Sequence, residues 1–588
     1  MTDPDDAARP EPLRLERMPP DPPLERPPAR GRAWPPAIAW FGFSAFWGHM
    51  RHLLASAIAT DNVDSRQWMA PEPPDELLAR AVRRLRDRGA REAPTLAGAM
   101  GGTVWIDFVS DTGDDVTVSE RVAELVAREY EVDDGGRRER LPRGDVLFLG
   151  GDLAYPVATV REVTRRLVEP WNRVLSALPE EPQRLLLAVP GNHDWYDGLD
   201  GFARLCQAPM PFEDTSELDP TRPRPNAFPV LAWAEAFAKG VQVAKPRAMA
   251  LSGYVPVQRT SYFRLPLARD LELFGVDRQL KQVDERQKAF FAHGSSPGER
   301  RARMIVVPDP ARAFGDVSPH GEKTLSALGV TPSEAPTFVL AGDIHHYERS
   351  LEGESLHVVA GGGGAFLHGA RIAGGAAYAI VAEFPGKRAS RALLARLPAT
   401  LALGGSGWLV LIFFAAMSTP PLLASACGAS ELASALASAV GIVYAVAAGL
   451  LVGLRKHRAH RVVPFSVATG ALLALVPVGL GRALASVIPS GVWALGVLVA
   501  LGVATIVCGG LFGAFLALLA AIVVNHEQPW AALGVPGFKC FVRMRVREID
   551  GEPTRIDAWV IGQVDPVRRS PPRIVDRFAF SSDRGAVD

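Results

Sequence analysis

The sequence predicts a mixed α/β domain, followed by an α-helical transmembrane bundle of about four spans and a small β-rich C-terminal tail. Up to about residue 390, short apolar runs that end in glycine and polar residues alternate with helical patterns, as in layered α/β folds. From about 400 to 524 charge almost disappears, and each apolar segment is near or above the ~20 residues that cross a bilayer. Beyond it, 538–548 and 555–564 alternate apolar and polar residues around Gly551, as a β-hairpin does.

Composition limits the partners and the compartment. The chain has 588 residues, and its 64 Lys and Arg balance 64 Asp and Glu, which argues against nucleic acid as a partner. The four cysteines show no zinc-binding or CxxC spacing and suit a reducing, cytosol-facing setting. Met1–Arg32 is rich in proline and charge and lacks the apolar core of a secretory signal.

The composition shifts divide the chain into five predicted segments. They are a disordered Pro/Arg-rich tail (1–35), an amphipathic helix and a linker helix (36–100), the α/β domain (101–390), transmembrane helices (398–525), and a cytoplasmic hairpin segment with a tail (526–588). Residues 37–58 are apolar and aromatic but contain His49, Arg51 and His52, which favours lying on the membrane over spanning it, and both remain open. Glu76–Arg91 predicts a solvated helix.

Polar side chains follow five of the predicted strands in the α/β domain. These strands are 103–110, 146–149, 185–189, 337–340 and 356–360. The first four lead to Asp111, to Asp152 and Tyr155, to Asn192 and His193, and to Asp343, His345 and His346. Open α/β sheets bind ligands at the carboxyl ends of their strands, so we expect these groups to meet there.

The chemistry of this set predicts a metal-dependent hydrolase. Oxygen and nitrogen ligands without thiolate suit Fe, Mn, Zn or Mg. A carboxylate shared by two such cations lets them clamp the attacking and leaving oxygens of a phosphoryl transfer. An imidazole beside the ligands can protonate the leaving alkoxide.

The apolar segments predict an anchor. We place spans near 401–424, 432–454, 463–487 and 491–524, and Gly509-Gly510 leaves open whether the last is one span or two. Arg and Lys flank the first span, the loop between the second and third, and the end of the fourth, which places 1–397 and the C-terminus in the cytoplasm. No span carries an ionisable residue at its centre, so a transport pathway is not indicated.

The ordered motifs of the domain resemble the calcineurin-like metallophosphoesterase superfamily over roughly 103–385. The motifs are Asp111, Gly151-Asp152, Gly191-Asn192-His193-Asp194 and Gly342-Asp343-Ile344-His345. The resemblance implies a four-layer αββα sandwich with a dinuclear metal site. Asp152 would bridge two divalent or trivalent metal ions, Asn192 would bind the second metal and His345 the first. Asp111 and Asp343 would complete the ligands, and His193, with Asp194 in its motif, would act on the leaving group.

Finer features resemble two subgroups. Gly151-Asp152-Leu153-Ala154-Tyr155 is similar to purple acid phosphatases, where a tyrosine ligates ferric iron, and a merely packed Tyr155 ring is the alternative. The fuller strings around Asn192, His345 and Gly361–Gly364 look like polytopic membrane phosphoesterases, in which several spans follow the sandwich. His346, Gly363 and His368 are candidate substrate contacts, against the alternative that they pack or turn the chain.

Two departures from the family pattern weaken the second metal site. Asp343 stands where an imidazole ligand is usual, which favours Mn or Mg over Zn. The strand near 304–307 leads into Pro308-Asp309-Pro310, where a histidine would be expected.

We therefore predict a metallophosphoesterase anchored in a bacterial inner membrane, with its site facing the cytosol and a phosphate mono- or diester as substrate. The anchored position is compatible with a lipid-linked ester. One alternative is a degenerate, non-catalytic sensor or scaffold, and another is a transporter with a regulatory phosphoesterase-like domain. The sequence leaves the substrate, the metal and the oligomeric state open.

Overall fold

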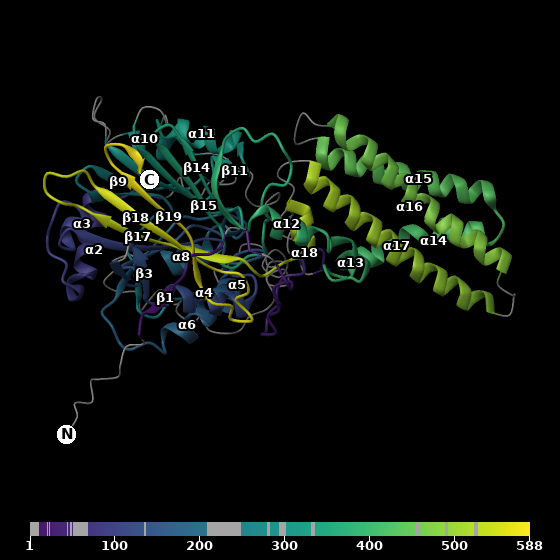
Figure 1. Cartoon of the computed structure of the whole chain (residues 1–588), viewed down its shortest axis with the longest axis horizontal. Coiled ribbons are helices and arrows are strands. Elements are labelled where there is room, and N and C mark those ends of the chain that lie inside the picture. The colour runs from purple at the N-terminus through teal and green to yellow at the C-terminus, as the bar shows by residue number, and fades with distance from the viewer. Residues whose placement is uncertain are drawn as a thin grey trace, which may run out of the picture.

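The protein consists of an α/β domain and a bundle of long helices, which extends from one side of the domain (Figure 1). The computed structural model describes residues 11–587 except 20, 23, 44, 48–49, 51–68, 135–136, 209–248, 279–282, 293–300, 331–334, 454–458, 488–491 and 523–526. The amphipathic helix predicted over 37–58 therefore lies outside the described residues from 51 onward.

The first large sheet has eight strands in the order β20-β19-β18-β17-β2-β5-β6-β7. Its parallel half consists of β2 (Thr103–Val109), β5 (Val146–Leu149), β6 (Arg184–Ala188) and β7 (Tyr254–Pro256). Its antiparallel half consists of β17 (Lys539–Arg547), β18 (Arg555–Gln563), β19 (Arg573–Ser581) and β20 (Gly585–Val587). The strands predicted after residue 102 and near 146 and 185, and the predicted hairpin around Gly551, are confirmed.

The C-terminal strands belong to the α/β domain. β17 runs antiparallel to β2, with Val542 opposite Phe108 and Met544 opposite Ile106. The segment over 526–588 is β-rich as predicted, but its strands complete the α/β domain instead of forming a tail that follows it. Apolar–polar alternation identifies a strand but carries no information about which sheet the strand joins.

The second large sheet has seven strands in the order β16-β14-β15-β13-β10-β9-β8. They are β8 (Phe263–Ala268), β9 (Leu271–Gly275), β10 (Ala302–Val307), β13 (Thr337–Ala341), β14 (Tyr347–Glu352), β15 (Ser355–Ala360) and β16 (Ile380–Phe384). β9, β10, β13 and β15 are parallel neighbours, so their carboxyl ends lie at one edge.

The two sheets share a hydrophobic core, and helices cover their other faces. Between the sheets, the rings of Phe148 and Phe263 lie 5.9 Å apart and those of Phe338 and Phe578 lie 5.8 Å apart. α4 (Val116–Ala127), α6 (Glu169–Leu175) and α8 (Asp200–Cys206) pack on the eight-stranded sheet. α10 (Glu285–Ala292) and α11 (Pro319–Ala327) pack on the seven-stranded sheet. The mixed α/β class is as predicted.

The described part of the N-terminal segment is ordered, against the prediction of a disordered tail over 1–35. β1 (Leu13–Leu15) pairs with β3 (Tyr130–Asp134), which pairs with β4 (Arg137–Leu141), and Leu15 is buried. Farther along, the Gly31 amide donates to Asp115 Oδ2 at 2.8 Å. A proline-rich, charged segment cannot form a core of its own, but this one uses the surface of the domain.

The helix predicted over Glu76–Arg91 as solvated is instead α2 (Pro74–Arg84), part of the domain. Leu77, Leu78, Ala81 and Val82 are buried in the core shared by the sheets. Their spacing repeats at the helical period, and this narrow apolar stripe is sufficient to dock an otherwise charged helix.

Four long helices form the bundle: α14 (Leu409–Ala426), α15 (Ser430–Gly453), α16 (Ala459–Val487) and α17 (Trp493–Ile522). Three described stretches, Leu409–Ala426, Val463–Val487 and Trp493–Ile522, are long and apolar enough to cross a membrane, which indicates membrane association. α17 is one continuous helix of 30 residues, so Gly509-Gly510 does not divide it. Gly513 instead lets α17 approach α13 (Leu397–Ala402), because a Cβ there would lie 2.7 Å from the Leu397 carbonyl oxygen.

Candidate active site

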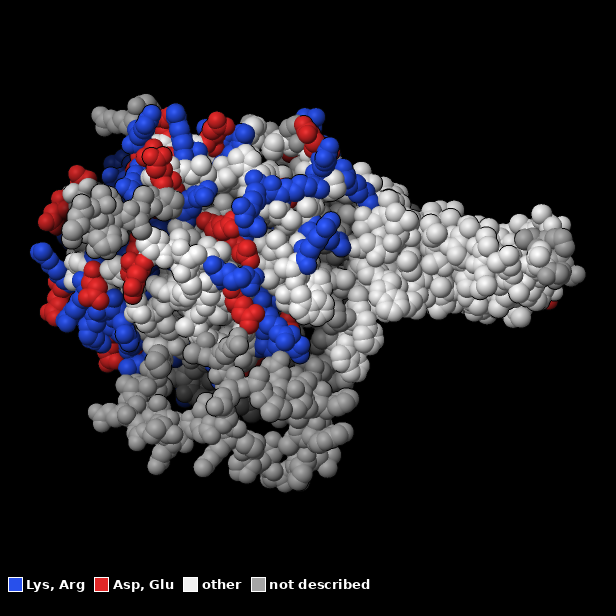
Figure 2. All heavy atoms as spheres, turned by 90° about the horizontal axis from the view of Figure 1, so that it is seen from below, with Lys and Arg blue, Asp and Glu red and all other residues white. Residues whose placement is uncertain are grey.

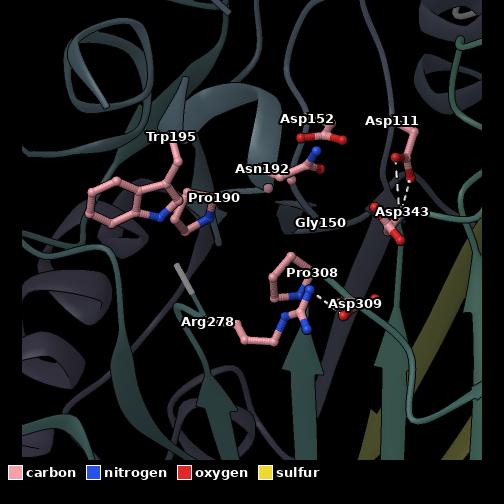
Figure 3. A pocket seen from close by; sticks show the side chains of 12 residues that line it. Asp111, Gly150, Asp152, Pro190, Asn192, Trp195, Arg278, Pro308, Asp309 and Asp343 are labelled. Atoms are coloured by element: carbon pink, nitrogen blue, oxygen red, sulfur yellow. Dashed lines mark hydrogen bonds and ion pairs between the residues drawn. The ribbon is translucent and has the colours of Figure 1, made fainter. Parts of the chain in front are cut away.

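A pocket opens where the carboxyl ends of strands from both large sheets meet. Its lining residues follow β2, β5, β6, β9, β10 and β13 and are Asp111, Gly150, Gly151, Asp152, Pro190, Gly191, Asn192, Trp195, Arg278, Pro308, Asp309 and Asp343. Figure 3 shows Asp152 and Asn192 across the pocket from Arg278 and Asp309, with Asp111 and Asp343 at one side. The strand-end rule that predicted these groups together therefore holds for Asp111, Asp152, Asn192 and Asp343.

Three of the pocket aspartates share an unusual backbone conformation. Asp111, Asp152 and Asp343 have φ of 59°, 52° and 64°, in the left-handed region that aspartate tolerates better than most residues. Each turns the chain directly after its strand. The Asp343 amide donates to both carboxylate oxygens of Asp111, at 3.1 and 3.0 Å, which ties the edges of the two sheets together.

Tyr155 and His345 converge on the two N-terminal aspartates. The buried Tyr155 hydroxyl lies 3.0 Å from Asp111 Oδ1, 3.3 Å from Asp152 Oδ2 and 3.1 Å from His345 Nε2. His345 Nδ1 is 2.8 Å from the Phe366 carbonyl oxygen, which fixes the ring with Nε2 toward Tyr155 and 3.6 Å from Asp111 Oδ1. Asp111, Asp152, Tyr155 and His345, all predicted ligands, thus form one cluster.

His193 lies beside the pocket, directly after Asn192. Its backbone amide donates to Asp152 Oδ1 at 2.8 Å, and its Nδ1 is 2.7 Å from the Pro156 carbonyl oxygen. The imidazole packs against Tyr155, with 4.5 Å between ring centroids. These contacts fix the ring and place Nε2 on the side away from Pro156.

Asp194 is buried and holds the two loops that carry the neighbouring groups. Its carboxylate accepts amide hydrogen bonds from Asp152 at 2.9 Å, Leu153 at 3.1 Å and Gly191 at 2.8 Å. Burial, with repulsion from Asp152, raises its pKa to about 8. This geometry gives Asp194 a positioning role, whereas the sequence placed it among the catalytic residues.

The three candidate substrate contacts face elsewhere. His346 packs edge-on against Phe314 at 4.6 Å and lies 3.6 Å from Glu348. His368 stacks on His345 at 4.3 Å, and its Nδ1 accepts the His345 amide at 3.0 Å. The Gly363 amide donates to the Ser110 carbonyl oxygen at 2.9 Å, so it is not free for an anion. None of the three lines the pocket described above.

Burial and mutual repulsion disfavour charge on the pocket carboxyls. Burial raises the pKa of Asp152 to about 7. Burial, together with repulsion from Asp152, raises that of Asp111, and burial with repulsion from Asp309, Asp152 and Asp111 raises that of Asp343. The pKa of His345 is lowered by burial, which leaves a neutral imidazole able to bind a metal.

Arg278 is the basic residue of this pocket, and the sequence reading missed it. It pairs with Asp309 (Figure 3), and within the described chain its Nη1 has no hydrogen-bond partner. Asp309, which stands in the turn where the family pattern has a histidine, lines the pocket. The signal for Arg278 was available: it follows β9 in the same strand-end context as the aspartates.

The donor chemistry fits a hard cation. Asp111, Asp152 and Asp343 bring carboxylates to one pocket, in which Arg278 is the only cation among the described lining residues, and Tyr155 and Asn192 add neutral oxygens. The side chains are not closed around a metal position: within the described residues, no three His, Cys, Asp or Glu are grouped closely enough to hold an ion. Binding would therefore require these carboxylates to move toward the cation.

Comparisons with known proteins give little more. No family model and no curated protein sequence matches the chain. Among the solved structures that match are "GAP50 the anchor in the inner membrane complex of Plasmodium" (9% identity, TM-score 0.27, 48% of this chain and 78% of that one) and "Structure of PhoD" (12% identity, TM-score 0.24, 45% of this chain and 58% of that one). This chain thus spans little more than half of the PhoD chain, and similarities this low carry no argument about function.

Proposed function

We propose that the protein is a membrane-anchored, metal-dependent phosphoesterase. The observation that supports this most is the convergence of four carboxyls, an amide and an arginine from the ends of six strands on one pocket. Such a pocket offers sites for both partners of the reaction: carboxylates for a cation and a guanidinium for the anionic ester. The two facing sheets with helices on their outer faces are also compatible with the four-layer αββα sandwich of such enzymes.

In this proposal Asp111, Asp152, Tyr155 and His345 hold one metal ion, and Asp152, Asn192 and Asp343 hold a second, weaker one. Mn, Fe, Zn or Mg would polarise the phosphoryl oxygens and lower the pKa of the attacking water. Arg278 binds a non-bridging oxygen of the ester through Nη1, which has no hydrogen-bond partner among the described residues. His193, held at Nδ1 by Pro156, donates a proton from Nε2 to the leaving oxygen.

The pairing of β2 with β17 supports four membrane crossings. β2 precedes the bundle and β17 follows it, yet the two are neighbours in one sheet. The chain must therefore return to the side from which it started, which requires an even number of crossings. α15, with 24 residues, supplies the fourth. The basic residues at the domain end of the bundle favour a cytoplasmic location for that side, and the proposed setting is a bacterial inner membrane.

The test is metal analysis and hydrolysis with the purified full chain in nanodiscs. We expect Mn- or Fe-loaded protein to hydrolyse a generic aryl phosphate monoester or diester. Asp152→Asn should lose bound metal and lower turnover by more than the ~10–100-fold typical of residues that only support a ligand. His193→Ala should keep its metal and lower kcat by about 10²–10⁴-fold. Asp133→Asn, at an exposed carboxyl of β3, is the matched control.

Full metal loading without His193-dependent turnover would instead favour a non-catalytic sensor or scaffold. The Arg278–Asp309 ion pair is the observation that favours this second function, because it neutralises one carboxylate of the pocket without a metal. Its signature would be a metal-loaded wild-type protein that binds phosphate without turnover, with the binding kept in His193→Ala and lost in Arg278→Ala.

A further inference from the structure

Large apolar side chains are exposed where the α/β domain meets the bundle. Phe43, Phe46, Trp47, Leu403 and Trp408 are between 53% and 76% exposed, and we call them the aromatic neck. The rings of Phe43 and Trp47 stack in parallel, with 6.2 Å between centroids. Exposed apolar groups gathered at one place are typical of a surface that is covered by a partner or a membrane.

The aromatic neck is hydrogen-bonded to the two segments through which the chain enters and leaves the bundle, both on the domain side. The Phe41 amide donates to the Ser406 carbonyl oxygen at 3.3 Å, three residues before α14 begins at Leu409. Arg30 donates to the carbonyl oxygens of Gly405, at 2.9 Å, and Leu533, at 2.8 Å, in α18 (Glu527–Leu533) beyond α17. The neck therefore lies at the level where the candidate spans begin and end.

The exposed charge on α12, at the domain end of the bundle, is basic, although the Asp21 carboxylate caps this helix and the exposed Glu527 begins α18. α12 (Lys387–Leu394) buries Ala389, Leu393 and Leu394 against the domain and has no acidic residue. Its exposed face and the following turn carry Lys387, Arg388, Arg391 and Arg396. Figure 2 shows Lys and Arg side chains, with some Asp and Glu among them, on the domain, and a described bundle surface almost free of charge. Basic residues beside an aromatic belt are the usual composition at a membrane surface with anionic lipids.

The N-terminal segment that carries Phe43, Phe46 and Trp47 also contacts the candidate active site. Trp40, three residues before Phe43, packs edge-on against Tyr155 at 5.7 Å and His193 at 6.1 Å. From the other side, Trp530 of α18 fits against Gly369, where a Cβ would lie 2.1 Å from the ring. The Leu367 amide also donates to the Val535 carbonyl oxygen at 2.9 Å, next to Phe366, which fixes His345. The segments that enter and leave the bundle thus lie next to Tyr155, His193 and the loop that holds His345.

We infer that the aromatic neck lies in the headgroup layer of the bilayer and that the substrate is the phosphate ester of a membrane amphiphile, which reaches the pocket from the bilayer. The substrate class rests on the proposed phosphoesterase activity, but the position of the neck does not. Continuity with the candidate spans and the basic face of α12 both favour a lipid surface over a second copy of the chain as the covering partner.

The position of the neck is tested by spin labelling, which needs no turnover. A nitroxide is attached to Phe46→Cys in the full chain in nanodiscs with anionic lipid, after the exposed Cys427 is replaced by serine; the other three cysteines are buried. The matched label is Asp550→Cys, at a side chain 94% exposed on the domain. We expect oxygen to relax the label at 46 more than a water-soluble nickel complex does, and the reverse at 550. Equal nickel access at both positions would overturn the inference. Protection at position 46 that persists in detergent and depends on protein concentration would also overturn it, in favour of self-association.

The substrate class is tested with the triple variant Phe43→Ser, Phe46→Ser, Trp47→Ser. Hydrolysis of a phosphorylated amphiphile in vesicles should fall by roughly ten-fold in kcat/KM, since the apolar contact with the bilayer is lost. Hydrolysis of a soluble aryl phosphate should remain unchanged. An equal loss for both substrates, or no loss for either, would contradict a lipid substrate. If wild-type protein hydrolyses neither, the phosphoesterase proposal fails, and the spin-label result still decides where the neck lies.

Discussion

The α/β domain and the helical bundle treat polar and apolar groups in opposite ways. The domain buries ion pairs such as Arg543–Asp107, with side chains 0% and 1% exposed, and Arg264–Glu272. The bundle exposes large apolar side chains, among them Ile442 and Leu498. Exposed apolar surface of this extent is unfavourable in water and neutral in lipid. The surface of the domain is therefore suited to water and that of the bundle to lipid, and the candidate site lies close to the junction of the two regions.

The two regions also differ in how the chain builds them. The bundle is one continuous segment, α14–α17, whereas the domain combines strands from before and after it. β17 lies between β2 and β18 and is paired on both sides. The bundle is thus an insertion within the domain, and the eight-stranded sheet cannot be completed until the membrane helices have been made.

The largest expected effect tests this dependence of the domain on the C-terminal strands. Truncation after Pro536 removes β17–β20 and leaves β2 without its antiparallel neighbour, although every proposed metal ligand is retained. Because β17 carries core residues such as Phe541 and Val542, we expect the domain not to fold. Limited proteolysis of the detergent-purified protein measures this directly.

The matched truncation after Ser582 removes only β20 (Gly585–Val587), the edge strand of the same sheet. It should keep the proteolysis pattern of the full chain. A protease-resistant domain in the longer truncation would show that β17–β20 are dispensable, and the comparison between a continuous bundle and an assembled domain would then lose its meaning.

A smaller effect is expected when the buried charge that joins the two chain halves is removed. Arg543 donates to Asp107 Oδ1 and Oδ2 at 2.6 and 2.9 Å and to the Val126 carbonyl oxygen at 2.8 Å. Arg543→Met leaves Asp107 buried without its charged partner and should lower the free energy of unfolding by about 3–5 kcal/mol. Arg14→Met, which breaks the exposed pair with Asp133, should cost only ~0–1 kcal/mol. Chemical denaturation followed by tryptophan fluorescence compares the two, and equal losses would contradict the role assigned to burial.

The part of the site that could be predicted follows from local rules. Asp111, Asp152, Asn192 and Asp343 each stand directly after an apolar run, and parallel strands bring their carboxyl ends to one edge. Neither step requires knowledge of the tertiary structure. The same reasoning extended to β9 would have identified Arg278, because it too follows a strand of the parallel set.

The rest depends on contacts between residues far apart in the chain. Trp40 reaches Tyr155 and His193 because the N-terminal segment is tied to the domain through hydrogen bonds such as Ile38 N to Asp114 Oδ1, at 2.8 Å. Nothing in the local pattern of residues 28–42 indicates those partners. The docking of β17 on β2 is hidden for the same reason, since both strands have the alternation of any sheet strand.

The smallest expected effect distinguishes the pocket carboxyls from the rest of the domain through the dependence of stability on pH. In the metal-free protein burial raises the pKa of Asp152 from 3.8 to about 7, so the folded state retains a proton that the unfolded state has lost. The contribution of Asp152 to stability should therefore be largest at low pH and fall as the pH rises from about 4 through 7. A bound cation requires the deprotonated carboxylate, so the rise in Tm on adding Mn²⁺ should be small near pH 5 and several degrees near pH 8. Differential scanning fluorimetry with EDTA or Mn²⁺ measures this, and Asp152→Asn should lose both the pH-dependent part and the metal effect. Equal stabilisation by Mn²⁺ at both pH values would mean that the cation binds elsewhere than at the aspartates.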